Sequence, residues 1–323
     1  MSSLRVNKST TVRSPISALR RVAIRSIHPI APGRAAHLAA RWFTTPDRAT
    51  SWRASDGARA LLDPGDRLTL ETRSQRLTAR SWGHGPLALL VHGWNGRGVQ
   101  LAAIGRALAA RGYRAVAFDH PGHGGSSGRT VTIPEMADAI RDVGAQLGGA
   151  RVVVAHSLGA VAATLALSRG LPARTAVFLA PPVSPDQWLL RFGRAVGLPA
   201  SAAPELIAAI EQRAGVAVQS VRPIDLGARL STPLLVIHDR GDREVPFGDG
   251  EALVRAWPGA RMLATDGLGH TRLLSSPLAL DAIADFVGDA EVGDGAAPPA
   301  RGATTWGVRD RHFAAIIDQL GAD

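Results

Sequence analysis

The first candidate for chemistry in the sequence is Ser157, which has a small residue two positions away on each side, Ala155 and Gly159. An apolar run at 152–155 precedes it, and a segment of helical period follows. A sharp strand-to-helix turn strains the serine backbone and brings neighbouring chain so close that only small side chains fit. The start of a helix also offers backbone N–H groups where negative charge can develop. The pattern indicates a serine nucleophile.

A second signal is the apolar run 87–91, which ends in His92-Gly93 and leads into a polar, glycine-rich loop. A turn of this kind can aim a backbone N–H at a pocket, and two such donors stabilise a tetrahedral oxyanion. We expect the donors to be the amides of Trp94 and Leu158. His92 itself is better interpreted as a buried residue that ties the loop together than as a catalytic base.

An acid and a histidine complete the set. Asp239 and Asp242 follow the apolar run 234–238, and either carboxylate could accept the Nδ1–H of a catalytic histidine. An Asp directly at a strand end, such as Asp239, usually caps the following turn. His270 lies in a glycine-rich loop after the run 261–264, where a ring can act as a proton shuttle.

Short apolar runs that alternate with segments of helical period must position these residues. The runs cover residues 77–82, 87–92, 115–119, 152–155, 176–179, 234–238 and 261–264. Continuous apolar strands separated by helices predict an α/β fold with a doubly wound, mostly parallel sheet. The candidate loops all follow strands, so they meet at one edge of the sheet. The stretch 68–82 predicts an antiparallel hairpin at the sheet margin.

Three regions depart from this alternation. Residues 1–50 predict a basic N-terminal arm with one short amphipathic helix that packs an apolar stripe on the body. The stripe consists of Ile16, Leu19, Ala23, Ile24 and Ile27. Within the main domain, 51–287, an insertion at about 183–231 predicts a small helical cap over a pocket. Residues 288–323 predict a linker and tail, with one helix near 309–320.

The formal net charge of +10 is concentrated in the arm, because residues 1–50 carry nine basic side chains and one acidic side chain. We therefore expect no nucleic-acid partner; weak contact of the arm with a membrane surface is the alternative to packing on the body. The absence of cysteine excludes disulfides, thiolate metal sites and a Cys nucleophile. With no apolar run of about eighteen residues and no secretory signal, a cytoplasmic protein is expected.

Taken together, these motifs resemble the α/β-hydrolase family, in particular its capped, lipase- and esterase-like bacterial members. His92-Gly93-Trp94 is similar to that group's oxyanion segment, and 119–126 to its Asp-x-Pro-Gly-His-Gly-x-Ser loop. Residues 155–159 resemble the nucleophile elbow, with Ala in place of the usual first Gly. Residues 238–246 resemble the acid loop, which favours Asp242 as the acid.

The resemblance implies an α/β-hydrolase fold and a triad of Ser157, Asp242 and His270, in the chain order of that family. It implies a small-molecule ester or related acyl substrate, no metal and no cofactor. An acyltransferase and a non-catalytic binding member of the fold are the alternatives. Relatives with an Asp nucleophile are disfavoured because position 157 is Ser. The fold hosts many acyl chemistries, so the particular substrate stays open.

Overall fold

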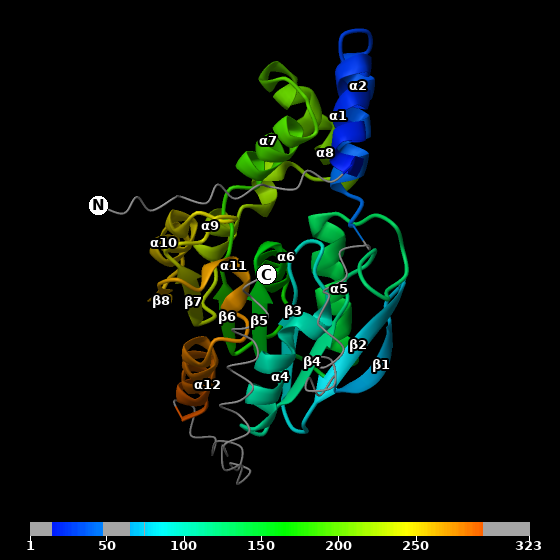
Figure 1. Ribbon diagram of the computed structural model, residues 1–323. Helices are drawn as coiled ribbons and strands as arrows, with labels where there is room; N and C mark the ends of the chain where they lie inside the picture. Colours follow the sequence, from blue (N-terminus) through cyan, green and yellow to red (C-terminus); the bar gives the residue numbers. More distant parts are fainter. Residues whose placement is uncertain (1–14, 48–64, 74, 293–323) are drawn as a thin grey trace, which may run out of the picture. The chain divides into compact units, whose positions relative to one another are not determined.

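A computed structural model of the 323-residue chain describes residues 15–47, 65–73 and 75–292. Contacts divide the chain into two units. The helical unit comprises the described parts of 1–43 together with 186–213, and the sheet unit comprises the described parts of 44–185 and 214–323. Figure 1 labels the helices and strands of both.

In its described residues, the sheet unit is built on eight strands in the spatial order β1-β2-β4-β3-β5-β6-β7-β8. Their bounds are β1 Asp66–Glu71, β2 Arg76–Trp82, β3 Leu87–Val91, β4 Arg114–Phe118, β5 Val152–His156, β6 Thr175–Leu179, β7 Leu234–Asp239 and β8 Arg261–Thr265. The edge strand β1 pairs antiparallel with β2, and β2 pairs antiparallel with β4. All other neighbours are parallel. The predicted sheet and its edge hairpin are confirmed.

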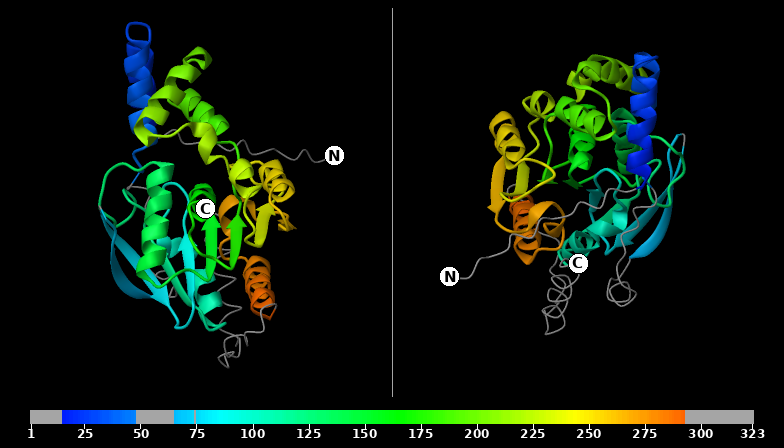
Figure 2. Two further views of the ribbon diagram at one scale, coloured as in Figure 1. Left: turned by 180° about the vertical axis from the view of Figure 1, so that it is seen from behind. Right: turned by 45° about the horizontal axis from the view of Figure 1, so that its top comes forward.

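Helices cover both faces of this sheet (Figure 2). They are α4 Ala102–Ala109, α5 Ile133–Gln146, α6 Leu158–Ser168, α9 Pro223–Gly227, α10 Phe247–Ala256, α11 Gly269–Arg272 and α12 Pro277–Val292. Successive side chains of β3 divide between two cores: Leu89 joins a cluster with α5 and α6, and Leu90 joins one with α4 and α12. Every residue of β3 is buried, as expected for a strand covered on both sides.

The helical unit contains α1 Pro15–Ile27, α2 Pro32–Phe43, α7 Pro185–Ala195 and α8 Ala203–Ala214. Small residues bring α2 close to its neighbours, because Ala35, Ala36, Ala39 and Ala40 are all buried. The Phe43 ring packs edge-on against Phe192, with ring centroids 5.1 Å apart.

Polar contacts also join α1 and α2, here called the N-terminal hairpin, to α7 and α8. The Arg21 guanidinium donates to the Ala195 carbonyl at 3.2 Å. His37 Nε2 donates to Gln212 Oε1 at 3.0 Å, and its Nδ1 donates to the Gly33 carbonyl. These two hydrogen bonds raise the pKa of His37, since both need a ring N–H.

The arm differs from the sequence-based expectation. Its described residues form two helices instead of one, because the expectation rested on the stripe from Ile16 to Ile27 and did not extend to the buried alanines of α2. On α1, Ile24 is buried as predicted, whereas Leu19 is 71% exposed. Part of the predicted stripe thus faces outward.

Two expected boundaries also differ. Residues 214–231 of the expected cap group with the sheet unit, since Val221 is buried in its core and Gly227 lies against the Trp257 ring. The helix α12 continues to Val292, past the expected start of the linker at 288, because buried Ile283 and Val287 anchor it. The helix expected near 309–320 lies outside the described residues. Within the described part of the chain, no helix has the length and apolarity needed to span a bilayer.

Candidate active site

Ser157 occupies a strained turn between β5 and α6. Its backbone has φ 52° and ψ −128°, a region that side-chain-bearing residues rarely adopt. The turn is held because the Ser157 amide donates to the Leu179 carbonyl at 2.9 Å and the Ser157 carbonyl accepts from the Ala160 amide. The side chain is 6% exposed. A strained serine at a strand-to-helix junction is the geometry of a nucleophile elbow.

Two glycines, one in the turn and one at the end of β3, permit the close packing around Ser157. A Cβ on Gly93 would lie 2.9 Å from the Ser157 Cβ, and a Cβ on Gly159 would lie 2.4 Å from the His92 carbonyl oxygen. The end of β3 therefore lies directly against the serine. Leu158 begins α6, so its amide belongs to the first turn, whose N–H groups have no intrahelical acceptor.

The loop after β3 is held in place by the buried side chain of His92. His92 Nδ1–H donates to the Gly93 carbonyl at 2.7 Å, and its Nε2 accepts from the His120 amide at 3.0 Å. Burial lowers the pKa of His92 to about 4, so the ring is neutral at neutral pH. His92 thus has the structural role expected for it.

Trp94 and Asn95 follow Gly93 in the loop after β3, and the His123 side chain holds this part of the loop. Its Nε2 accepts the Asn95 amide at 3.2 Å, and its ring packs edge-on to the Trp94 ring at 5.2 Å between centroids. Asn95 adopts a left-handed backbone with φ 56°. These contacts fix the backbone that carries the Trp94 amide.

The loop 119–126 is a compact support for the same edge. The Asp119 carboxylate accepts the amides of Gly98 at 2.7 Å and Gly125 at 2.8 Å. Gly124 has φ 46°, and a Cβ there would lie 2.0 Å from the Asp119 carboxylate. The glycines of this loop therefore permit its fold.

Asp242 and His270 form a buried hydrogen-bonded pair. His270 Nδ1–H donates to Asp242 Oδ2 at 2.8 Å, which leaves Nε2 as the unprotonated nitrogen of the neutral ring. Asp242 Oδ1 accepts the amides of Glu244 at 2.8 Å and Val245 at 3.0 Å. The Asp242 side chain is 0% exposed.

His238 adds a fourth contact to this carboxylate. Its Nε2 lies 3.5 Å from Asp242 Oδ2 and 3.2 Å from the Val245 carbonyl. Burial alone would raise the pKa of Asp242, but hydrogen bonds from His238, His270 and the Val245 amide outweigh it and hold that pKa far below its usual value. Asp242 is therefore ionised.

Asp239 has a different set of partners. Its Oδ1 accepts the Gly241 amide at 2.9 Å, and its Oδ2 accepts the Thr265 hydroxyl and the Leu268 amide, both at 2.8 Å. Burial opposes ionisation, but these hydrogen bonds together hold the pKa of Asp239 below its usual value. Asp239 ties the end of β7 to the loop that carries His270, and no contact between Asp239 and the His270 ring occurs in the described residues.

Ser157 and His270 are brought to the same region without a direct bond. Among the described residues, no hydrogen bond joins the Ser157 hydroxyl to His270. The link is His156, whose Nε2–H donates to the His270 carbonyl at 3.0 Å and whose ring lies 4.7 Å from the His270 ring. Burial and the neighbouring His270 lower the pKa of His156 to about 3.

Three positioning residues were not singled out from the sequence: His123, His156 and His238. His123 and His238 fall inside the two motifs that resemble the family's loops, which was a usable signal. His156 gave no signal beyond its place beside Ser157.

Metal binding has no support in the described residues. The rings of His92, His120 and His123 cluster together, with centroids of His92 and His120 4.7 Å apart. In the part of the chain described, however, no group of three His, Cys, Asp or Glu side chains is arranged to hold a metal ion.

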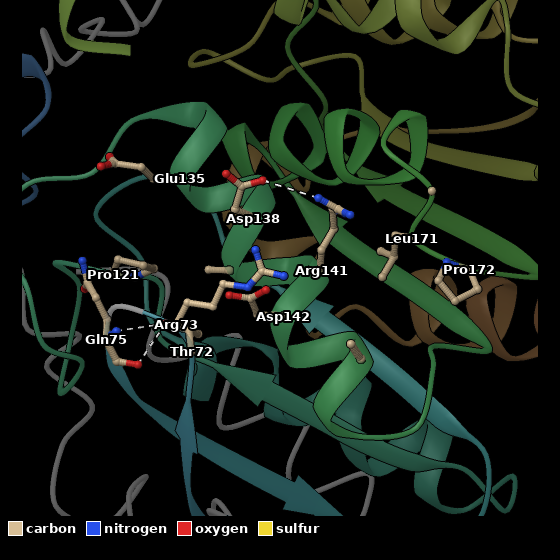
Figure 3. A pocket seen from close by; sticks show the side chains of 13 residues that line it. Thr72, Arg73, Gln75, Pro121, Glu135, Asp138, Arg141, Asp142, Leu171 and Pro172 are labelled. Atoms are coloured by element: carbon tan, nitrogen blue, oxygen red, sulfur yellow. Dashed lines mark hydrogen bonds and ion pairs between the residues drawn. The ribbon is translucent and has the colours of Figure 1, made fainter. Parts of the chain in front are cut away.

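A cavity of about 530 Å³ lies elsewhere in the sheet unit (Figure 3). It is lined by the turn after β1, by α5 and by 170–172 after α6, and it carries both signs of charge. Asp138 and Arg141 in its wall form an ion pair at 3.8 Å. None of Ser157, Asp242 and His270 lines it, so it is separate from the candidate site.

The fold and this constellation define a class of protein. Residues 88–283 match the family model of the alpha/beta hydrolase family. This match covers more than half of the chain, and the chain therefore belongs to the alpha/beta hydrolase family.

Its relatives are hydrolases. The chain is 25% identical over 242 residues to a pyrethroid hydrolase of Sphingobium wenxiniae, covering 61% of this chain and 86% of that protein. A thermophilic esterase from Thermogutta terrifontis matches with a TM-score of 0.56 and 20% identity, over 70% of this chain and 99% of the other. An esterase from Exiguobacterium antarcticum matches with a TM-score of 0.54 and 16% identity, over 68% and 98%. The two structures support the fold alone.

Proposed function

We propose that this protein is a serine hydrolase that cleaves a carboxylic ester, or a related acyl bond, through an acyl-enzyme. The observation that carries the proposal is the buried Asp242–His270 hydrogen bond at 2.8 Å, together with the contact of His270 with His156, which directly precedes a serine held at φ 52°. In this proposal Ser157 is the nucleophile, His270 the base and Asp242 the orienting acid.

The proposed mechanism follows from the tautomer of His270, which carries its proton on Nδ1. With Nδ1–H bound to Asp242, His270 Nε2 removes the Ser157 proton while the hydroxyl oxygen attacks the substrate carbonyl carbon. The amides of Trp94 and Leu158 are assigned to the oxyanion. When the tetrahedral intermediate collapses, the leaving alcohol takes the proton from Nε2. Water, activated by the same nitrogen, then releases the carboxylic acid and restores the serine.

Covalent labelling tests the nucleophile directly. A fluorophosphonate probe should label the wild-type protein at Ser157 and leave Ser157→Ala unlabelled. The variant should also lose esterase turnover by about 10⁶, the usual effect of removing a triad nucleophile, with an unchanged circular dichroism spectrum. Labelling of the variant at wild-type rate would refute the assignment.

The substrate class needs a screen. p-Nitrophenyl esters of increasing chain length, together with a pyrethroid, would define the acyl preference. Transfer of the acyl group to an added alcohol in preference to water would identify an acyltransferase. Absence of both labelling and turnover would identify a binding member of the fold. A cytoplasmic location is part of the proposal and is checked by cell fractionation.

A further inference from the structure

An apolar surface lies on the N-terminal hairpin. The described residues include four large hydrophobic side chains that are strongly exposed, and three of them, Leu19, Val22 and Ile30, fall within twelve residues. Their exposed fractions are 71%, 64% and 87%. Leu19 and Val22 are three positions apart on α1 and share one face, and Ile30 follows in the turn to α2.

The helices that carry this apolar surface also carry positive charge. Residues 1–46 contain eight Arg or Lys and no Asp or Glu. Arg25, Arg34 and Arg41 are exposed on the same two helices. The remaining part of the helical unit, 186–213, carries three acidic and three basic side chains. Five of the eight basic residues lie on α1 and α2, so within the helical unit these two helices carry the excess positive charge.

Two of the hairpin's arginines hold the surface in place. The Arg20 guanidinium stacks on the Trp42 ring at 5.4 Å, and Arg21 donates to the Ala195 carbonyl. Arg20 and Arg21 thus contact the neighbouring segments of the unit, while Leu19 and Val22 on the same helix are exposed. Leu19 and Val22 are exposed because other side chains of α1 make its contacts within the helical unit.

We propose that the surface formed by Leu19, Val22 and Ile30 binds an anionic lipid bilayer. Aliphatic side chains gain from contact with acyl chains, and arginines around them gain from anionic headgroups. A second copy of the chain fits less well, because docking would place two acid-free, cationic surfaces together. A nucleic acid would leave the three aliphatic side chains without a complementary partner.

Vesicle cosedimentation tests this surface in the full-length protein. The wild type should bind vesicles that contain phosphatidylglycerol and should bind pure phosphatidylcholine much less. Combined substitution of Leu19, Val22 and Ile30 by Ser should weaken binding to the anionic vesicles by about ten-fold or more. Combined substitution of Arg25 and Arg34 by Gln should also weaken it by about ten-fold, and added salt should reproduce that loss.

Leu278→Ser is the matched control, since Leu278 is the fourth exposed side chain, lies on α12 and is 54% exposed. It should bind as the wild type does. Equal binding to both lipids, absence of binding, or unaltered binding by the triple variant would overturn the proposal. Self-association lost in the triple variant would assign the surface to a second copy, and DNA binding lost only in the arginine variant would assign it to nucleic acid. Unchanged circular dichroism shows that each variant is folded.

A second inference concerns Glu244, and it rests on the proposed function. The Glu244 Oε2 lies 3.8 Å from His270 Nε2, the nitrogen to which the mechanism assigns proton transfer. The Glu244 side chain is 67% exposed, whereas Asp242 beside it is buried against Nδ1. A leaving-group oxygen that takes a proton from Nε2 must come within hydrogen-bond distance of that nitrogen. It therefore also comes close to the Glu244 carboxylate.

Charged side chains that lie close to His270 or Asp242 in the sequence have partners of their own. The Arg272 guanidinium, on α11, donates to the Gly267 and Leu268 carbonyls. Arg240 stacks over the Phe247 ring at 4.8 Å. The His156 ring contacts the His270 ring; burial and the neighbouring His270 lower the pKa of His156 to about 3, so it is neutral.

We infer that Glu244 makes the site select esters whose leaving alcohol carries a positive charge over esters with a neutral or anionic one. A positive charge on the leaving alcohol, held about 4 Å from this exposed carboxylate, is expected to raise the rate or affinity by about five-fold.

An isosteric pair of substrates measures this selectivity: a choline ester and the 3,3-dimethylbutyl ester of the same acid. The ratio of their kcat/KM values should fall about five-fold in Glu244→Gln and should keep its value in Glu251→Gln, a control carboxylate exposed on α10. An unaltered ratio in Glu244→Gln would overturn this inference and leave the hydrolase assignment standing. Absence of turnover on any ester in the wild type would instead overturn the proposed function.

Discussion

Two carboxylates three residues apart have opposite surroundings. The Asp242 Oδ2 atom lies 2.8 Å from a His270 nitrogen and 3.5 Å from a His238 nitrogen, whereas the Asp239 carboxylate accepts hydrogen bonds from amides and a hydroxyl. Asp242 can therefore fix the tautomer of the His270 ring, whereas Asp239 holds backbone amides and the Thr265 hydroxyl in place. This difference leads to separate predictions for the two acids.

Asp242→Asn should reduce kcat by about 10⁴, because the amide cannot hold the His270 tautomer with Nδ1–H. The substitution keeps an oxygen for the Glu244 and Val245 amides, so the fold should persist. Steady-state kinetics on a small soluble ester measures the effect. A variant with near wild-type kcat would show that Asp242 is not the orienting acid.

Asp239→Asn should act mainly on stability, with a loss of about 1–3 kcal/mol, because buried donors lose their acceptor. Its pKa is lowered by folding, so its contribution is complete above the ordinary Asp pKa of about 3.9 and is lost as the pH falls through the folded-state value. The difference between wild type and variant in urea unfolding should thus be full at pH 7 and narrow below about pH 4. A kcat loss larger than that of Asp242→Asn would transfer the acid role to Asp239.

At the scale of elements, the candidate site depends on how closely β3 approaches the start of α6. Backbone strain at Ser157 is tolerable because β5 and the first ten residues of α6, on either side of it, are buried and cannot relax. The glycines at 93 and 159 set the distance of that approach.

Gly159→Ala should therefore separate the two elements. Its Cβ would meet the His92 carbonyl at 2.4 Å, and backbone cannot yield as a flexible side chain can. We expect a loss of about 1–3 kcal/mol in unfolding free energy and a large fall in kcat. Thermal unfolding and kinetics measure both.

Gly248→Ala is the control for this change. Gly248 is the second residue of α10, as Gly159 is of α6, and a Cβ there meets nothing within 4 Å. Alanine should stabilise that helix by about 0.5–1 kcal/mol. If the two variants behaved alike, the close approach of β3 would have no importance for the site.

At the scale of the whole molecule, the chain divides into two units, and the N-terminal residues contribute to one of them. Ala35, Ala36, Ala39 and Ala40 on α2 are buried, as are Leu189, Leu206 and Ile210 on α7 and α8. The arm is thus a structural part of the helical unit. Its removal would leave the apolar faces of α7 and α8 without their partner.

Deletion of residues 1–43 should make 186–213 susceptible to limited proteolysis and promote aggregation, since buried apolar area becomes exposed. The sheet unit should retain its circular dichroism signal from the strands. Deletion of residues 1–14 alone is the control and should leave 186–213 resistant. Equal resistance in both truncated proteins would show that α7 and α8 are stable without the hairpin.

The sequence by itself determined the parallel sheet, its edge hairpin and the positions of the candidate residues along the chain. Apolar runs covered on both faces have a distinctive composition, and the turns that follow them need glycine or small residues whatever the rest of the chain does. For this reason Ser157, Asp242 and His270 could be proposed before any contact was known.

Only the tertiary structure decided which groups face those residues. Asp239 and Asp242 follow the same strand, and the sequence-based case against Asp239 was a general preference; the hydrogen bond at 2.8 Å from His270 to Asp242 depends on how two loops 28 residues apart meet. The contact of Glu244 with His270 and the outward direction of Leu19 likewise have no local signal. Local composition fixes an element and its termini, whereas the neighbour that a side chain meets depends on packing between segments distant in the sequence.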